Sequence, residues 1–239
     1  MVFGAIMAGG VGSRLNIAAY PKQFLPLGEY PILIHTLKTF LQSDALDAIY
    51  IGVHPQWLDH TRDLINTHIV TEKPITLVPG GGDRNDTLFK VVAQIEDDHG
   101  ADDAHIIVTH DGVRPFVTVD MIDESVCLAS KHGACGAVVP SIDTVAVSFD
   151  HTVMDNIPDR STLYQCQTPQ TFNINLLKSA FASLTEAEKA VLTDACKICL
   201  LKGIPVYLSK GSTDNIKITT MGDYNIAKAL TQLSAQQDS

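Results

Sequence analysis

The residues with the clearest chemistry form a glycine-rich stretch close to the N-terminus. Gly9, Gly10 and Gly12 follow a short apolar run, and two cationic residues, Arg14 and Lys22, come soon after them. Because glycines lack Cβ atoms, their backbone N–H groups can close around a ligand, and fixed cations nearby suit a polyphosphate. An ordinary strand-to-helix turn is the alternative, but it leaves the two cations unexplained. The stretch therefore predicts a phosphate-binding loop.

Spacing separates this loop from two better-known phosphate-binding motifs. A Walker A loop ends in Gly-Lys-Ser/Thr, and no such ending follows these glycines. A dinucleotide-binding fingerprint requires Gly-x-Gly-x-x-Gly, and Leu15 stands where its third glycine belongs. The loop belongs to neither class.

A second glycine cluster, residues 80–87, reads Gly-Gly-Gly-Asp-Arg-Asn-Asp-Thr and lies between a predicted strand and a predicted helix. Exposed backbone amides there, with the side chains of Asp83 and Thr87, can hydrogen-bond a planar base and a ribose. The alternative is a capped helix start with Asp83 or Asp86 as the capping acid. The residues alone favour neither interpretation.

Asp111 follows a predicted strand at its carboxyl end, where ligands gather in open α/β sheets. A carboxylate at this place can hold Mg²⁺ against phosphate oxygens, since Mg²⁺ often uses one or two carboxylates together with substrate phosphates. The alternative is an ion pair between Asp111 and Arg114 that holds a loop. His110 is interpreted as structural or site-lining rather than as a metal ligand.

Two more polar clusters lie in the C-terminal half. Lys217 is part of an alternating, strand-like run and is predicted to project into the same site, with Asp214 as a possible second metal contact. Asp159 and Arg160 precede the segment 165–170, Gln-Cys-Gln-Thr-Pro-Gln. The alternative for this last cluster is the polar base of a projecting arm.

Composition bounds the class of protein. The 239 residues, 45% hydrophobic and 18% charged, predict one folded α/β domain over residues 1–239. A net charge of −10 argues against nucleic-acid or anionic-membrane partners, and no apolar run reaches a membrane span of ~20 residues. Without a basic leader, a soluble, cytoplasmic protein is expected. The five cysteines are expected to be reduced, and Cys196 and Cys199 structural rather than half of a zinc site.

Strand and helix patterns alternate, which predicts a mostly parallel sheet with crossover helices. Strands are predicted at 2–7, 48–53, 75–78, 105–109, 134–139 and 205–208, and helices at 31–40, 55–68, 87–96, 119–132, 173–183, 186–201 and 222–235. Residues 141–165 are predicted to form a hairpin arm that interrupts the domain. Because an isolated arm cannot bury both faces, we expect it to pack on a second subunit in a homodimer.

Seven motifs, taken together, resemble the IspD/TarI family of sugar-alcohol-phosphate cytidylyltransferases, in family order across nearly the whole chain. They occupy residues 8–14 (Ala-Gly-Gly-Val-Gly-Ser-Arg), 21–23 (Pro-Lys-Gln), 81–84, 110–115 (His-Asp-Gly-Val-Arg-Pro), 167–170 (Gln-Thr-Pro-Gln), 193–194 (Thr-Asp) and 214–217 (Asp-Asn-Ile-Lys). The resemblance implies a nucleotide-diphospho-sugar transferase fold, which is Rossmann-like, with a dimerising arm. It also implies CTP and a polyol phosphate as substrates and Mg²⁺ or another divalent cation as cofactor.

The resemblance further implies a role for each matching residue. Catalytic roles fall on Arg14, Lys22, Arg160 and Lys217; CTP binding on Met7, Ala8, Gly9, Gly10, Gly81, Gly82, Asp83, Arg84, Thr87 and Gly112; acceptor binding on Arg114, Arg160, Thr168 and Lys217; and metal binding on Asp111. Arg160 is expected to act from the arm of the neighbouring subunit.

Two branches of the family compete. One uses 2-C-methyl-D-erythritol 4-phosphate in isoprenoid synthesis, and the other converts D-ribitol 5-phosphate to CDP-ribitol for teichoic acid or capsule polymers. The chain resembles the ribitol branch more, through residues 31–36, 52–54, 110–116, 163–172 and 192–197. Gly82 and Gly112 depart from the residues usual in the family, without removing a charged group. The remaining alternatives are a nucleotidyltransferase for another base and a catalytically silent nucleotide-binding scaffold.

Overall fold

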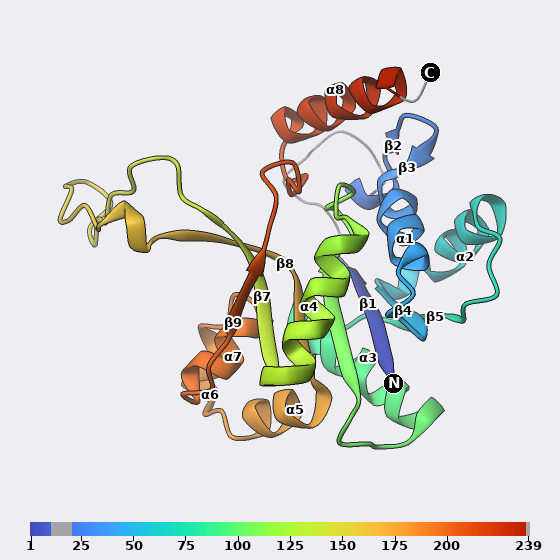
Figure 1. Cartoon of the computed structure of the whole chain (residues 1–239), viewed down its shortest axis with the longest axis horizontal. Coiled ribbons are helices and arrows are strands. Elements are labelled where there is room, and N and C mark those ends of the chain that lie inside the picture. Colours follow the sequence, from blue (N-terminus) through green and yellow to red (C-terminus); the bar gives the residue numbers. More distant parts are fainter. Residues whose placement is uncertain (11–20, 238–239) are drawn as a thin grey trace.

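A seven-stranded sheet forms the centre of the protein, for which a computed structural model describes residues 1–10 and 21–237 (Figure 1). The strand order is β5-β4-β1-β6-β8-β7-β9. Strand β8 runs antiparallel to β6 and β7, and the other neighbouring pairs are parallel. The strands are β1 (Val2–Ala8), β4 (Ala48–Val53), β5 (Ile75–Pro79), β6 (Ile106–Asp111), β7 (Ala134–Pro140), β8 (Tyr164–Asn173) and β9 (Tyr207–Lys210). The expected α/β class with a mostly parallel sheet is confirmed.

Helices cover both faces of the sheet, so that the protein has three layers. One face is covered by α3 (Arg84–His99), α5 (Ile174–Ala182) and α7 (Ala195–Leu201). The other is covered by α1 (Ile32–Gln42), α2 (Leu58–His68) and α4 (Val119–His132). The short strands β2 (Pro26–Leu27) and β3 (Tyr30–Pro31) form a separate ribbon that contacts α8 (Met221–Gln237). The remaining elements are α6 (Glu186–Ala190) and the 3-10 turns η1 (Lys22–Phe24), η2 (Pro55–Trp57) and η3 (Arg160–Thr162).

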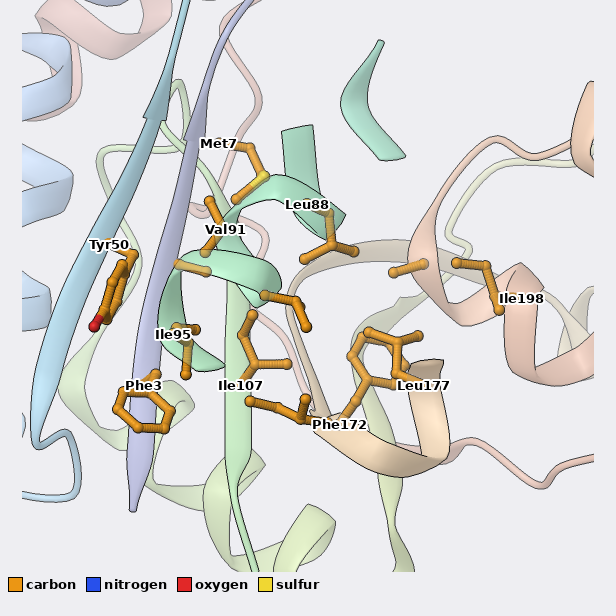
Figure 2. Close-up of a cluster of buried hydrophobic side chains, with 14 of the residues drawn as sticks. Phe3, Met7, Tyr50, Leu88, Val91, Ile95, Ile107, Phe172, Leu177 and Ile198 are labelled. Carbon is orange, nitrogen blue, oxygen red and sulfur yellow. The ribbon is translucent and has the colours of Figure 1, made fainter. Parts of the chain in front are cut away.

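The side chains of β1 alternate between the two faces of the sheet, and those on both faces are apolar, as expected for a central strand. Phe3, Ala5 and Met7 pack into the core beneath α3, which Figure 2 shows, whereas Ile6 and Ala8 pack into the core on the opposite face. A strand between two helical layers is buried on both faces and therefore reads as a continuous apolar run. Its register sets Met7 level with Asp111 of β6. The glycine loop after β1 and the carboxylate that ends β6 consequently share one edge of the sheet.

Local chemistry fixes where the helices nearest that edge begin. Asp83 is the N-cap of α3, and its carboxylate accepts a hydrogen bond from the backbone N–H of Asp86 at 2.8 Å. Thr118 caps α4 in the same way, and α4 ends at Gly133, whose φ of 85° is left-handed and thus suits glycine. The capped-start interpretation of residues 80–87 is confirmed, with Asp83 as the acid.

Several sequence predictions of elements are wrong in informative ways. Residues 164–173 form the antiparallel strand β8, whereas the sequence reading ended the arm at 165 and assigned no element to 166–172. The predicted helix 186–201 is two helices, α6 and α7, separated by residues 191–194, which include the N-cap Asp194. The predicted strand-like run around Lys217 is irregular, because its backbone is held by turns and side-chain contacts instead of a ladder.

The segment 141–163 leaves the sheet after β7 and returns at β8, as the projecting arm of Figure 1. Its two limbs are joined by an isolated antiparallel bridge between Val147 and Asn156. A long regular hairpin is absent from this described segment, so the arm is looser than the sequence predicted. In the part of the chain that the structure describes, no helix is long and apolar enough to cross a membrane.

Candidate active site

Two adjoining cavities lie at the edge of the sheet where β1, β4 and β6 end. The larger, about 450 Å³, is lined by Met7, Ala8, Gly9, Gly10, Lys22, Gln23, His54, Gly81, Gly82, Asp83, Arg84, Thr87, Asp111, Val113 and Lys217. The smaller, about 160 Å³, is lined by Arg84, Asp111, Arg114, Cys166, Gln167, Thr168, Gln170, Thr193, Asp194 and Lys217. Both lists contain Arg84, Asp111 and Lys217, so these three side chains stand at the junction.

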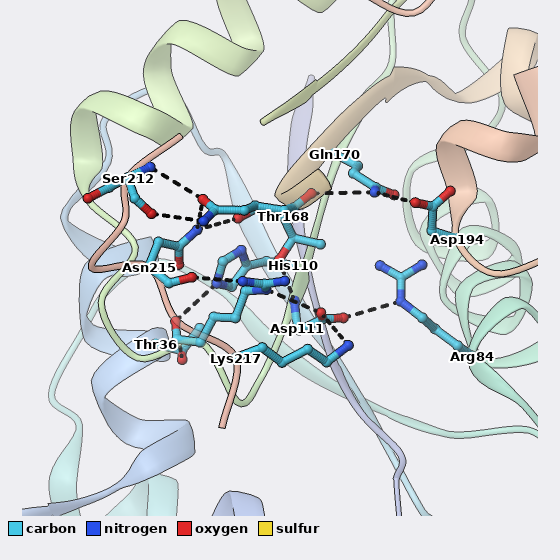
Figure 3. A network of polar contacts seen from close by, with 12 residues as sticks. Thr36, Arg84, His110, Asp111, Thr168, Gln170, Asp194, Ser212, Asn215 and Lys217 are labelled. Carbon is cyan, nitrogen blue, oxygen red and sulfur yellow. Dashed lines mark hydrogen bonds and ion pairs between the residues drawn. The ribbon is translucent and has the colours of Figure 1, made fainter. Parts of the chain in front are cut away.

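Asp111 is the centre of that junction, and three cations converge on it (Figure 3). Its carboxylate lies 2.9 Å from Lys217 Nζ, 3.2 Å from Arg84 Nε and 3.5 Å from Arg114 Nε. Burial by itself raises the pKa of Asp111, but Arg84, Lys217 and Arg114 together hold that pKa well below its usual range. The three cations therefore favour the ionised form of Asp111.

The three cations differ in how much of their hydrogen-bonding capacity is used. Arg114 is buried, and its Nη1 donates to the backbone oxygen of Asn215 at 2.7 Å. Both terminal nitrogens of Arg84 are buried without a hydrogen-bond partner in the described structure, although its Nε pairs with Asp111. A guanidinium fork with both terminal nitrogens unused beside a cavity is suited to a phosphate or another oxygen-rich group.

The second glycine cluster is folded onto the start of α3. The backbone N–H of Gly81 donates to Thr87 Oγ1 at 2.9 Å, and the N–H of Gly82 donates to Asp86 Oδ2 at 2.8 Å. A Cβ on Gly81 would lie 2.0 Å from that same carboxylate oxygen, so only glycine fits. Residues 81–84 and Thr87 still line the large cavity. The two interpretations left open by the sequence are therefore compatible, since one segment both caps the helix and forms a cavity wall.

Gln23 holds the first glycine loop and was not singled out from the sequence. Its buried side-chain nitrogen donates to the backbone oxygens of Ala8 at 2.8 Å and Gly10 at 3.1 Å. Gln23 also follows Lys22 in η1, and both line the large cavity. In the sequence, Gln23 was marked only as the last residue of the Pro-Lys-Gln motif. The predicted residues Gly12 and Arg14 lie outside the described residues.

His54 is a second lining residue without a sequence-based assignment. It follows β4, and its Nδ1 accepts a hydrogen bond from the backbone N–H of Gln56 at 3.3 Å. That bond leaves Nε2 as the protonated nitrogen of a neutral ring. The backbone N–H of Gly80 donates to the oxygen of Val53 at 2.6 Å, which places His54 next to the second glycine cluster.

Three predicted residues are not brought to either cavity. Gly112 faces inward, where a Cβ would lie 3.1 Å from Leu33 and 3.3 Å from Ile6. Asp214 is exposed and absent from both linings, so the suggestion that it contacts a metal is wrong for this arrangement. Arg160 is exposed on the arm, where its Nη1 donates to the backbone oxygen of Ile142 at 3.0 Å.

His110 lies directly beneath Asp111 and is fully buried. Its Nε2 donates to the backbone oxygen of Arg114 at 3.1 Å, so the neutral ring carries its proton there. Burial lowers the pKa of His110 to about 4. The expectation that His110 is structural or site-lining rather than metal-binding agrees with this position.

We expect His110 to make the protein less stable in mild acid. Its pKa of about 4 lies below the value of 6.5 in an unfolded chain, so the unfolded state binds the proton first and stability falls as pH drops from about 6.5 to 4. The full effect is roughly 3 kcal/mol. Urea denaturation without added divalent cations at pH 7.5, 6, 5 and 4.5 should show the stability advantage of wild type over His110→Gln shrinking with acidification. A constant difference would contradict it.

The donor set fits a magnesium ion that is held largely by its nucleotide. The structure offers the junction one ionised carboxylate, Asp111, and hard oxygen ligands of this kind suit Mg²⁺. No group of three or more His, Cys, Asp or Glu side chains among the described residues forms a complete metal cage. Mg²⁺ commonly retains waters and substrate phosphates as ligands, so a single carboxylate is sufficient.

The cysteines are placed as expected from the sequence. All five are free thiols, and Cys135, Cys196 and Cys199 are buried. Burial raises the pKa of Cys199 to about 11, which keeps that thiol protonated and unreactive. Cys196 and Cys199 lie on the buried face of α7 and pack into the core.

Comparisons with known proteins agree with this arrangement. Residues 2–232 match the family model IspD, described as 2-C-methyl-D-erythritol 4-phosphate cytidylyltransferase. The crystal structure of 4-diphosphocytidyl-2C-methyl-D-erythritol synthase from Anaerococcus prevotii is 26% identical, with a TM-score of 0.80 over 97% of this chain and 96% of that one.

Two further solved structures show the same fold at lower identity. The 2-C-methyl-D-erythritol 4-phosphate cytidylyltransferase of Francisella tularensis is 24% identical, with a TM-score of 0.76 over 95% of this chain and 98% of that one. The enzyme of that name from Thermus thermophilus is 23% identical, with a TM-score of 0.72 over 97% of this chain and 100% of that one. Since the family model spans nearly the whole chain, this protein belongs to the IspD family of CTP-dependent cytidylyltransferases.

Proposed function

We propose that the chain transfers the cytidylyl group of CTP to the phosphate of a small polyol phosphate, releasing pyrophosphate. The observation that carries the proposal is the junction at Asp111, where a carboxylate and three cations separate two cavities of unequal size. The larger cavity is bordered by two glycine-rich segments and suits a nucleoside triphosphate. The smaller is lined by hydroxyl, amide and charged side chains and suits a compact polyol.

The chemistry is a substitution at the α-phosphorus of CTP. An oxygen of the acceptor phosphate forms the new bond to the α-phosphorus, the bond to the bridging oxygen breaks, and pyrophosphate leaves with that oxygen. A phosphate monoester is already anionic near neutral pH, so the reaction requires no general base. Positioning and charge stabilisation must then supply the rate enhancement.

Each cation at the site has a place in that scheme. Lys22, together with Arg14 of the undescribed part of the loop, stabilises the α-phosphate transition state and the departing pyrophosphate, with help from the amides of Gly9 and Gly10. Lys217 and Arg114 meet the acceptor phosphate, and Thr168 contacts it from β8. Both terminal nitrogens of Arg84, which lines both cavities, bind oxygens at the junction.

Asp111 would hold Mg²⁺, and the ion would supply charge neutralisation to the triphosphate. The second glycine cluster, with Gly81, Gly82, Asp83 and Thr87, recognises the cytosine and ribose. Because hydrogen bonds within the cluster already fix its backbone, the base meets a preorganised wall.

D-Ribitol 5-phosphate is the acceptor that the chain's own residues support, and its product would be CDP-ribitol for teichoic acid or capsule polymers. The support is the resemblance of five segments to the ribitol branch, above all 163–172 and 192–197. Residues of these two segments, including Thr168, Thr193 and Asp194, line the smaller cavity. This position supports a role for them in selecting the acceptor.

2-C-methyl-D-erythritol 4-phosphate is the second candidate acceptor, and the comparisons favour it. The family model is described by this substrate, and the solved relatives from Anaerococcus prevotii and Francisella tularensis are named for this activity. The relative with the higher identity shares only 26% of its residues with the chain, so its name supports the chemistry more strongly than the acceptor.

Pyrophosphate release with CTP and Mg²⁺ separates the candidates. We expect rapid release with D-ribitol 5-phosphate, and kcat/KM at least ten-fold lower with 2-C-methyl-D-erythritol 4-phosphate. The reverse ratio would assign the chain to the second acceptor. Replacing CTP by UTP or ATP should lower kcat/KM sharply, and equal rates with all three nucleotides would overturn the cytidylyltransferase assignment itself.

We further propose a homodimer formed through the arm. Ile142, Phe149, Val153 and Met154 of the arm are 73%, 84%, 60% and 62% exposed, which is unusual for a cluster of apolar side chains in one segment. A partner's surface would cover them and receive Arg160. Mixing two inactive variants, Arg160→Ala and Lys217→Ala, should restore activity if Arg160 acts across the dimer. No recovery after subunit exchange would exclude that role.

A further inference from the structure

The chain segment that carries Lys217 has no regular structure of its own. Residues 211–218 follow β9 as turns and extended backbone, with no strand pairing. Lys217 nevertheless reaches Asp111 with its Nζ at 2.9 Å, although its side chain is 42% exposed. A flexible lysine on an irregular segment loses entropy when it is held in one place. Some other contact must therefore fix the backbone from which Lys217 projects.

Two buried carboxamides, Gln167 of β8 and Asn215 of this segment, make that contact. Figure 3 labels Asn215, Ser212 and Thr168 in this network. Gln167 Nε2 donates to the backbone oxygen of Ser212 at 2.8 Å, and Gln167 Oε1 accepts from Asn215 Nδ2 at 3.0 Å and from the N–H of Ser212 at 3.3 Å. Asn215 Nδ2 also donates to the backbone oxygen of Thr168 at 2.8 Å. The two amides thus join the segment to the strand beside Asp111.

The same pair is connected to the other groups at the junction. The backbone oxygen of Asn215 accepts from Arg114 Nη1 at 2.7 Å, and the hydroxyl of Thr168 accepts from the N–H of Asp111 at 3.1 Å. Beyond Lys217, the N–H of Ile218 donates to the backbone oxygen of Val113 at 2.9 Å. Lys217 is therefore held from both sides, by the amide pair before it and by this bond after it.

Gln167 and Asn215 are polar although they are buried, which indicates that they do more than fill space in the core. Asn215 is fully buried, yet its Oδ1 has no hydrogen-bond partner in the described structure. Leaving a buried acceptor unpaired is costly, and an apolar residue of similar size would avoid that cost. What an apolar residue cannot supply is the pair of N–H donors that reach Gln167 and Thr168. Gly211 leaves room for the side chain of Gln167, because a Cβ at this position would lie 2.7 Å from Gln167 Oε1 and 2.8 Å from the backbone oxygen of Val138.

We propose that Gln167 and Asn215 are positioning residues for the acceptor half of the site. They fix Lys217, Arg114 and Thr168 relative to Asp111. Asn215 lines neither cavity, whereas Gln167 also lines the smaller one. The expected kinetic effect of this inference rests on the proposed function. The accessibility of the Lys217 amine does not, because it can be measured without turnover. The wall that faces the nucleotide, formed by the two glycine clusters, is not connected to the pair by any of these bonds.

The direct test measures how accessible the amine of Lys217 is. Wild type, Gln167→Met and Asn215→Ala are labelled with an excess of acetylating reagent, and mass spectrometry gives the rate at Lys217 and at a reference, Lys178, which pairs with Glu96 far from the site. We expect Lys217 to react several-fold faster in both variants, with Lys178 unchanged. Equal Lys217 rates in wild type and both folded variants would overturn the proposal.

Kinetics then separate positioning from general destabilisation. In both variants the KM for the polyol phosphate should rise about ten-fold and kcat should fall, while the KM for CTP stays within two-fold. A loss of folded protein would lower kcat without changing either KM. Asn173→Ala is the matched control, since Asn173 is likewise a carboxamide that donates to a backbone oxygen, but it caps α5 at the opposite end of β8. It should keep both KM values.

The outcomes remain distinguishable if one part fails. A variant that does not fold is replaced by Gln167→Glu, which retains the acceptor Oε1 and loses the donor to Ser212. Faster labelling of Lys217 in a protein that turns over no polyol phosphate would uphold the positioning role and overturn the proposed function. Altered kinetics with unchanged labelling would overturn the positioning role.

Discussion

Asp111→Asn is expected to lose both activity and stability, more than any other single change at the site. The substitution removes the charge that balances Lys217, Arg84 and the buried Arg114, and it removes the carboxylate proposed to hold Mg²⁺. Breaking a buried ion pair from one side costs about 3–5 kcal/mol, because the remaining charge stays desolvated. The exposed part of Lys217 can recover water, so a loss near the lower end, about 3 kcal/mol, is expected.

The catalytic effect is separable from the loss of stability. Pyrophosphate release is measured well below the melting temperature of the variant, where kcat/KM should fall by ~10²–10³, the usual size for loss of a group that organises charge in a transition state. Asp59→Asn is the matched control, because Asp59 pairs with Arg62 on the surface and is 93% exposed. Its effect on stability should stay within about 1 kcal/mol. Full activity of Asp111→Asn would remove Asp111 from the mechanism.

Lys22→Ala is expected to lose activity with little loss of stability. Lys22 is half-buried in η1 and lines the large cavity beside the first glycine loop. If it stabilises charge that develops in the transition state, then kcat and kcat/KM fall together by ~10²–10³ and the KM for CTP changes little. The free energy of unfolding should fall by less than about 1 kcal/mol.

Lys131→Ala provides the comparison, because Lys131 is an exposed lysine near the end of α4 and remote from both cavities. It should match wild type in rate and in urea midpoint. A Lys22→Ala protein with a normal kcat and a raised KM for CTP would show that Lys22 binds the nucleotide equally in the ground state and in the transition state. A normal kcat/KM would exclude Lys22 from either role.

Sequence reasoning succeeded where one physical signal dominated. Continuous apolar runs located β1 and β4, and glycine-rich segments after strands located both walls of the large cavity. These signals are local, because a strand buried on both faces must be apolar and a backbone that closes on a ligand must lack Cβ atoms. The pairing of β1 with β4 and β6 then brought Asp111 to the edge where the first glycine segment begins, as expected from the carboxyl ends of neighbouring parallel strands.

It failed where structure depends on distant partners. Residues 164–173 are polar in their first half and do not look like a buried strand, yet they pair with both β6 and β7. Tyr164, Gln165 and Cys166 are exposed, whereas Gln167, Thr168 and Gln170 are buried beside the smaller cavity. Gln23, Gln167 and Asn215 were missed for a related reason, since an uncharged amide shows its role only through the bonds it makes.

The expected position of Lys217 was correct for the wrong reason. A strand was predicted to aim it at the site, whereas two buried amides and one backbone bond hold an irregular segment there. The missing strand also accounts for Asp214. On the irregular segment its side chain is exposed to solvent and does not face the site as a metal contact would. Arg160 depends on the arm, and the sheet alone does not bring it near either cavity.

Isotope transfer tests the central claim most directly. A polyol phosphate with ¹⁸O in its phosphate is incubated with CTP and Mg²⁺, and ³¹P NMR follows the label. If the acceptor phosphate attacks the α-phosphorus, the CDP-polyol carries ¹⁸O in the bridge between its two phosphorus atoms and on its polyol-bearing phosphate, and the released pyrophosphate carries none. Label in pyrophosphate, or no CTP-dependent product with either candidate acceptor, would contradict the account.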